Sequence, residues 1–179
     1  LSVYYAATLA YSLRLKRVIL IDVLVLAGLY TLRVIAGGAA TGLGPSFWLL
    51  GFSMFLFLSL ALVKRYSELL LVQAQEQETA AGRGYQVVDL ETLAHFGVAS
   101  GYASVLVLAL YIDSAAVDTL YRYPEVLWLI CPLFLYWISR VWLLTRRDMM
   151  HEDPILFAIE DRRSHWLIAV MVGVVWAAA

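Results

Sequence analysis

Four long apolar stretches, each about as long as a bilayer is thick, most strongly constrain how this chain can fold. They cover residues 18–39, 45–63, 92–112 and 125–145. A helix needs roughly 20 apolar residues to cross the hydrocarbon core, and these stretches lack the alternating pattern of a barrel strand. Because 63% of the residues are hydrophobic and the mean hydropathy is +0.79, the sequence predicts an all-α polytopic transmembrane helical bundle.

Two shorter apolar stretches lie at the ends of the sequence, at residues 3–13 and 166–179. Each is too short to cross a bilayer by itself, and neither has the basic region and cleavage site of a signal peptide. We therefore expect a partial helix at each end. On this interpretation, residues 1–179 form a single membrane domain that is a fragment of a longer protein.

The basic residues between the apolar stretches alternate from one side of the predicted membrane to the other. Ten of the eleven Lys and Arg residues in loops lie in the first, third and fifth loops, and Arg122 is the exception. Cytoplasmic loops carry such an excess, so these charged loops are predicted to be cytoplasmic in a multi-pass protein of the cell (inner) membrane. The net charge of -1 offers no overall basic field, so a nucleic-acid partner is not expected.

Two charged residues, Asp22 and Arg33, interrupt the first span. They are eleven positions apart, which is about three helical turns with roughly 20° of angular drift, so they share one helix face. A charge that faces lipid costs at least ~2.5 kcal/mol, so we expect both side chains to face the bundle interior. Either each charge pairs with a partner on another helix, or both line a polar cavity for a substrate or an ion.

Further charges lie at the predicted cytoplasmic ends of the spans. Lys64, Arg65 and Glu68 follow the second span, and Lys64 and Glu68 have the i, i+4 spacing of a salt bridge on a helix end. Positive-inside topology alone also explains such basic residues. In the last loop, His151, Glu152 and Asp153 could be metal ligands, but Asp153 before Pro154 is better explained as the N-cap of a short helix over 154–162.

Several of these residues occur in strings that resemble one known family, the UbiA superfamily of membrane prenyltransferases. The strings are similar to the branch typified by decaprenyl-phosphate phosphoribosyltransferase. The resemblance rests on Tyr11-Ser12, Leu15-Lys16, Asp22-Val23, Leu32-Arg33, Ala36-Gly37, the segment Lys64-Arg65-Tyr66-Ser67-Glu68-Leu69, and the tail His151-Glu152-Asp153-Pro154 with Asp161-Arg162.

The resemblance implies the C-terminal part of a UbiA-like bundle with Mg²⁺-dependent transferase activity on polyprenyl (phosphate) substrates and diphosphate release, including 5-phosphoribosyl transfer. The implied partners are a polyprenyl lipid, a phosphorylated donor such as phosphoribosyl diphosphate, and the bilayer itself. The implied catalytic residues are Lys64 and Glu68, with Glu68 also a metal ligand. The implied substrate-binding residues are Tyr11, Lys16, Asp22, Arg33 and Arg65.

The sequence departs from the family pattern at the second acidic motif. The family has D-x-x-x-D there, whereas this chain has the single carboxylate of Glu68 beside two cations. The first acidic motif, N-D-x-x-D-x-x-x-D, would lie upstream of Leu1. Two other classes stay open at this point: a secondary transporter with Asp22 and Arg33 along a polar intramembrane path, and a membrane scaffold without catalytic activity.

Overall fold

A computed structural model of the chain describes residues 8, 11, 14–42, 46–76, 84–147 and 161–179. Its longer helices are α2 (Ile21–Thr41), α3 (Phe47–Ala74), α4 (Leu90–Ile112), α6 (Ile130–Arg146) and α8 (Arg162–Ala178). The shorter elements are η1 (Leu15–Arg17), η2 (Val87–Asp89), α5 (Ala115–Leu120) and η3 (Pro124–Leu129). These described ranges contain no β-strand.

Among the described residues, four helical segments have the length and composition needed to cross a membrane: Ile21–Thr41, Phe47–Ala74, Val87–Ile112 and Pro124–Arg146. This finding confirms the predicted all-α polytopic architecture. The expected partial helix over 3–13 lies almost wholly outside the described residues, and so does most of the expected short helix over 154–162.

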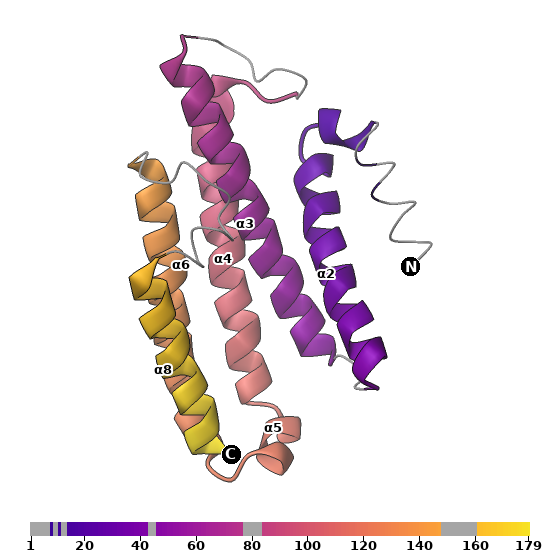
Figure 1. Ribbon diagram of the computed structural model, residues 1–179, viewed down its shortest axis with the longest axis vertical. Coiled ribbons are helices and arrows are strands. Elements are labelled where there is room, and N and C mark those ends of the chain that lie inside the picture. Colours follow the sequence, from indigo (N-terminus) through magenta and orange to yellow (C-terminus); the bar gives the residue numbers. More distant parts are fainter. Residues whose placement is uncertain (1–7, 9–10, 12–13, 43–45, 77–83, 148–160) are drawn as a thin grey trace.

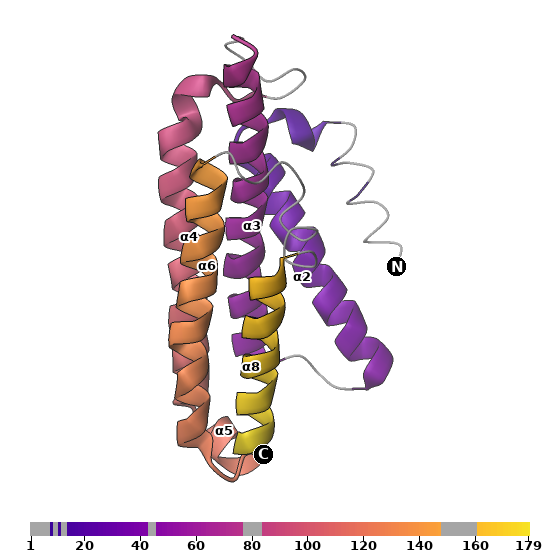
Figure 2. The same ribbon diagram turned by 60° about the vertical axis from the view of Figure 1, so that its left-hand side comes forward.

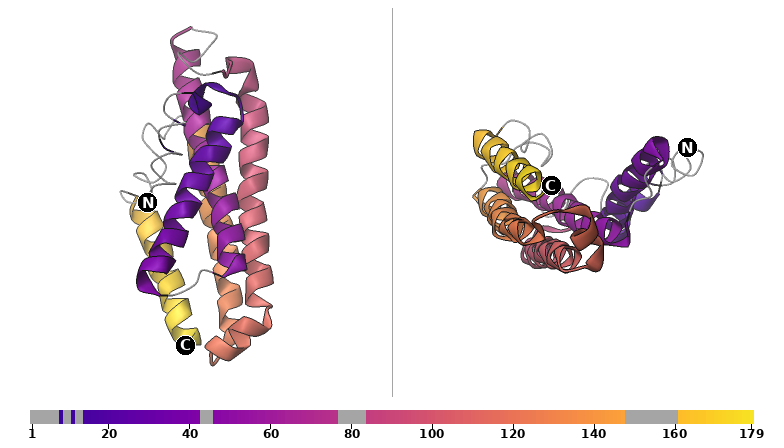
Figure 3. Two further views of the ribbon diagram at one scale, coloured as in Figure 1. Left: turned by 90° about the vertical axis from the view of Figure 1, so that its right-hand side faces the viewer. Right: turned by 90° about the horizontal axis from the view of Figure 1, so that it is seen from below.

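The helices form one curved layer rather than a closed ring. Consecutive long helices run in opposite directions, and each packs on the next in the order α2, α3, α4, α6 and α8 (Figure 1). Seen from below, the layer is a crescent with α2 at one edge and α8 at the other (Figure 3). The chain segments that carry η1, the end of α3 and the start of α4 therefore lie at one end of the bundle.

Local chemistry explains where α2 ends and where α3 begins. Gly42 ends α2 in the left-handed conformation, and the side chain of Ser46 caps α3 by accepting a hydrogen bond of 3.1 Å from the amide of Leu49. The second span was expected to end at residue 63, before the first charges, but α3 continues to Ala74. Arg65, just past the predicted end of the span, is buried by an ion pair.

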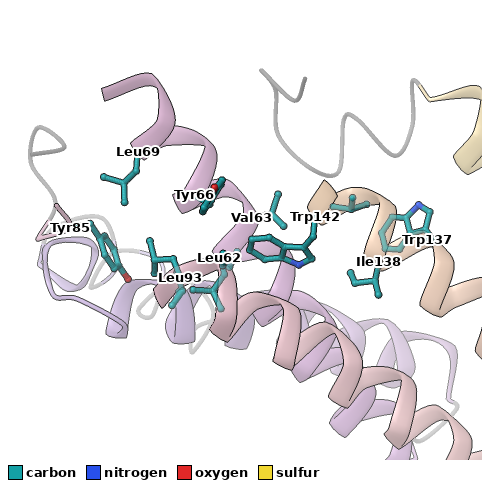
Figure 4. Packing of buried hydrophobic residues seen from close by; sticks show 13 residues of the cluster. Leu62, Val63, Tyr66, Leu69, Tyr85, Leu93, Trp137, Ile138 and Trp142 are labelled. Carbon is teal, nitrogen blue, oxygen red and sulfur yellow. The ribbon is translucent and has the colours of Figure 1, made fainter. Parts of the chain in front are cut away.

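Helices α3, α4 and α6 meet in a core that runs from Tyr85 to Trp137 (Figure 4). At its centre the ring of Trp142 lies where any side chain at Gly97 would be, and its Nε1 donates to Ser59 Oγ at 3.1 Å. Ser59 in turn donates to the carbonyl of Gly97 at 2.7 Å. Small residues at such positions let membrane helices approach closely, so the glycine determines how tightly α6 packs on α4.

Candidate functional site: a buried charge network between α2 and α3

An ion pair links the first turn of α2 to the C-terminal half of α3. The Nε of Arg65 donates to Oδ2 of Asp22 at 2.6 Å, and the two side chains are 2% and 0% exposed. A buried charge in a membrane helix needs a partner because no water replaces its lost hydration. Of the two interpretations of Asp22 left open by the sequence, the structure shows the ion pair to another helix.

The same guanidinium reaches two more groups, one on α3 and one before η1. One terminal nitrogen of Arg65 forms an ion pair with Glu68, which lies three residues further along α3 and is 33% exposed. The other donates to the hydroxyl of Tyr11 at 3.3 Å. Arg65 therefore lies between a fully buried carboxylate and an accessible one, and it connects the segment before η1 to α3.

Tyr85 completes the network, and the sequence reasoning missed it. It is 1% exposed, and its hydroxyl donates to Oδ1 of Asp22 at 2.5 Å while accepting from the amide of Leu20 at 2.9 Å. Burial, followed by the hydrogen bond to Asp22, raises the pKa of Tyr85 well above its ordinary value, so the hydroxyl stays protonated at neutral pH. Since 63 positions separate Tyr85 from Asp22, no local pattern could have linked them.

The two predicted lysines lie at the same end of the bundle as this network. Lys16 is in η1, directly before α2, and Lys64 is in α3 beside Arg65; both side chains are partly exposed. Figure 1 shows η1 and the C-terminal part of α3 at the same end. The predicted residues Tyr11, Asp22, Arg65 and Glu68 are thus joined by direct contacts, and Lys16 and Lys64 are on the elements that carry them.

Arg33 does not share this environment. It is exposed on α2, and its guanidinium lies over the ring of Tyr30 at 4.8 Å from the ring centroid. The expectation that it faces the bundle interior is wrong for the described part of the chain. Its face is shared with Asp22, but α2 diverges from α3 along its length (Figure 2), and the buried residues of α2 all lie at or before Leu29.

A second polar cluster joins α6 to the start of α8. Arg140 binds Asp161 through both terminal nitrogens, at 2.6 and 3.0 Å, and Asp161 accepts from the amide of Ser164 at 2.8 Å. Trp137 donates to Ser164 Oγ at 3.0 Å. Burial alone would raise the pKa of Asp161, but hydrogen bonds from Arg140 and Ser164 lower it to about 2. This cluster fixes α8 on α6, and its donors and acceptors satisfy one another.

Within the residues described, no group of three or more His, Cys, Asp and Glu side chains is placed to hold a metal ion. The residues His151, Glu152 and Asp153, which the sequence offered as possible metal ligands, lie outside the described residues. An apolar pocket is present at the opposite end of the bundle from the charge network, and its lining residues are Ser46, Trp48, Leu49, Phe52, Leu108 and Tyr111. It contains none of the predicted site residues.

The fold and the site together define an all-α polytopic bundle with a buried charge network between two of its spanning helices. The chain is 42% identical over 174 residues to the uncharacterized protein y4nM of Sinorhizobium fredii, covering 96% of this chain and 33% of that protein. It is 32% identical over 164 residues to the nodulation protein NoeC of Azorhizobium caulinodans, covering 90% of this chain and 52% of that protein.

A shorter similarity extends to an enzyme. The chain is 39% identical over 71 residues to decaprenyl-phosphate phosphoribosyltransferase of Mycobacterium tuberculosis, covering 40% of this chain and 24% of the enzyme. No family model matches the chain. The chain thus spans about a third of the length of y4nM and about half that of NoeC.

Proposed function

We propose that the protein is an integral membrane transferase of the UbiA type that moves a 5-phosphoribosyl group from phosphoribosyl diphosphate to a polyprenyl phosphate. The observation that carries the proposal is the network around Arg65, in which charged groups of α2 and α3 meet the hydroxyl of Tyr11 at the end of the bundle that bears Lys16 and Lys64. The partial similarity to decaprenyl-phosphate phosphoribosyltransferase supports the same chemistry.

In the proposed reaction, a phosphate oxygen of the lipid attacks the anomeric carbon of the donor and forms a new C–O bond. The bond from that carbon to the diphosphate breaks, and its electron pair leaves with the diphosphate. The ammonium groups of Lys16 and Lys64 are the partly exposed cations assigned to the departing diphosphate, since preorganised positive charge stabilises charge that develops in a transition state. The apolar helix faces accommodate the lipid chain.

Arg65 and Asp22 take a different role in this proposal from the one implied by the resemblance. The three nitrogens of Arg65 bond Asp22, Glu68 and Tyr11, and Asp22 is fully buried. We assign these two residues to positioning: they hold Glu68 and Tyr11 at the edge of the site and do not contact the donor. Arg33, exposed on α2, is assigned to neither donor nor lipid phosphate.

We further propose that Mg²⁺ binds together with the phosphorylated donor. Magnesium sites in phosphoryl enzymes commonly use one or two carboxylates, with the remaining ligands from substrate phosphates and water. Glu68 is the accessible carboxylate of the network and fits as one such ligand, whereas Asp22 is buried and already paired. When bound, the ion would supply positive charge against the diphosphate.

The test is transfer from labelled phosphoribosyl diphosphate to polyprenyl phosphate in membranes that carry the full-length protein. Lys64→Ala should lower the rate on the order of 10²-fold, the usual scale for losing one charge-stabilising group. Glu68→Gln should also lower it. Arg146→Ala, which removes an exposed charge in the last turn of α6, is the matched control and should retain the wild-type rate.

Full activity in both Lys64→Ala and Glu68→Gln would show that these charges only anchor the helix end. A wild-type protein that transfers neither phosphoribosyl nor prenyl groups, yet moves a solute across vesicles, would instead establish the transporter class.

A further inference from the structure

The segment Gly84–Gln86, just before η2, lies against the turn that leads from η1 into α2. A Cβ atom at Gly84 would be 2.8 Å from Cγ1 of Ile19 and 3.1 Å from the backbone oxygen of Arg17. Neither atom is the free tip of a flexible chain, so the close approach requires glycine. The loop between α3 and α4 therefore makes a specific contact with the basic turn.

At this contact, the hydroxyl of Tyr85 bonds the backbone at the N-cap position of α2. The N-cap position of α2 is Leu20, which has no capping side chain, and the amide of Leu20 donates to Tyr85 at 2.9 Å. The same hydroxyl donates to Asp22, the second residue of the helix. A single oxygen thus bonds both sides of the point where the chain enters α2.

The backbone at that point is strained. Leu20 has φ 63° and ψ -34°, a conformation that residues with a side chain rarely adopt. Such a residue keeps its conformation only where its surroundings enforce it, and such sites gather around functional groups. Leu20 is itself 39% exposed, so packing of its own side chain does not account for the conformation. The amide of Ile21 donates to the carbonyl of Ile19 at 2.8 Å, which closes a tight turn around Leu20. The hydroxyl of Tyr85 holds that turn from outside, through the amide of Leu20 and the carboxylate of Asp22.

The residues directly before this turn are basic. Arg14, Lys16 and Arg17 lie in and beside η1, and the direction of η1 relative to α2 is set at Leu20. A change at Leu20 would therefore swing Lys16 relative to the network around Arg65. The contact with Tyr85 opposes that change, together with the backbone hydrogen bond from Ile21 to Ile19.

We infer that Tyr85 is a positioning residue that holds the basic turn Arg14–Arg17 against α2, and that it thereby shapes the binding of a diphosphate group. The second half rests on the proposed function, and the first half does not. The experiment separates the two halves by measuring protease access to the turn and the affinity for diphosphate independently in the full-length protein.

The variant is Tyr85→Phe, which keeps the buried ring and removes only the hydroxyl. Trypsin should then cleave after Arg14, Lys16 or Arg17 at least several-fold faster than in wild type, as mapped by mass spectrometry. Binding of inorganic diphosphate, measured by titration calorimetry in detergent, should weaken about 10-fold, the scale of losing one or two hydrogen bonds. The matched control is Tyr102→Phe, which loses a 3.0 Å hydroxyl bond to Ser139 between α4 and α6 and should change neither readout.

Gly84→Ala reaches the same contact from the backbone and keeps the Tyr85 hydroxyl. It should also raise the rate of trypsin cleavage at the basic turn. This variant replaces Tyr85→Phe in the experiment if Tyr85→Phe fails to accumulate in the membrane. Unchanged cleavage in both variants would overturn the positioning role. Faster cleavage with unchanged diphosphate binding would overturn the link to the ligand. If wild type binds no diphosphate and transfers no phosphoribosyl group, the proposed function falls with that link, and the cleavage rates alone decide the positioning role.

Discussion

Arg65 on α3 and Asp22 on α2 form an ion pair at 2.6 Å in which neither side chain is more than 2% exposed. Tyr85 binds the second oxygen of Asp22, so both carboxylate oxygens are occupied. The pair is therefore the main polar connection between α2 and the rest of the described bundle.

Removing one partner of this pair should be costly. Arg65→Met leaves the Asp22 carboxylate buried without its cation, which typically costs about 3–5 kcal/mol. The double variant Asp22→Leu with Arg65→Met should lose much less than the sum of the two single variants, because it leaves no buried charge at that pair. Unfolding of the full-length protein in detergent, followed by tryptophan fluorescence, measures all three. Additive losses would contradict a coupled pair.

The packing of Trp142 on Gly97 gives a second prediction. Gly97→Ala places a Cβ within the indole ring, so it should destabilise the protein by about 1–3 kcal/mol, the usual cost of overpacking a core. Gly37→Ala in α2 is the matched control, since a Cβ there meets nothing within 4 Å. Equal thermal stability of the two variants would mean that α6 can shift away from α4 freely.

Leu20 offers a test of strain that is independent of any ligand. Leu20→Gly removes the cost of a positive φ, about 1–2 kcal/mol, and adds the greater unfolded-state freedom of glycine, about 0.5–1 kcal/mol. The melting temperature should hold or rise slightly. Leu24→Gly, another exposed leucine of α2 but inside the regular helix, should lower it. The same loss in both variants would show that Leu20 is not strained.

The bond between Arg140 and Asp161 predicts how stability depends on pH. The folded state lowers the pKa of Asp161 from 3.8 to about 2, so this carboxylate contributes stability at neutral pH that is lost as the pH falls from about 4 to about 2. Asp161→Asn should be less stable than wild type at pH 7, and the difference should shrink towards pH 2. A constant difference across this window, measured by thermal unfolding, would exclude the linkage.

The membrane orientation can be tested with single cysteines in a Cys131→Ala background. Because ten loop cations lie on one side and Arg122 on the other, Asp118→Cys should react with an impermeant maleimide in intact cells, and Arg83→Cys only after permeabilisation. The reverse pattern would invert the orientation of every span.

Hydropathy predicted the spans because membrane insertion depends on local composition. The cost of a lone charge in lipid predicted that Asp22 faces the bundle interior, but it left open whether Asp22 pairs with another helix or lines a polar cavity. Helix α3 continues past the predicted end of its span, and Arg65 there is neutralised by a residue 43 positions away, a pairing that no sequence window can register. Arg33 was misplaced because a shared helix face is buried only where a neighbouring helix covers it. Tyr85 and Trp142 were missed for the same physical reason: their contacts come from folding, not from periodicity.

Because α2 diverges from α3, it is held to the rest of the described bundle mainly near its N-terminal end. It is bonded near one end, at Leu20 and Asp22, and its last buried residue is Leu29. The helix is about 30 Å long at 1.5 Å per residue, so a tilt of about 10° around the Asp22 end would carry Thr41 sideways by about 5 Å. The ion pair with Arg65 lies at the pivot, where such a tilt moves it least. Opening at the far end of α2 could therefore occur without breaking the charged connection that holds the helix.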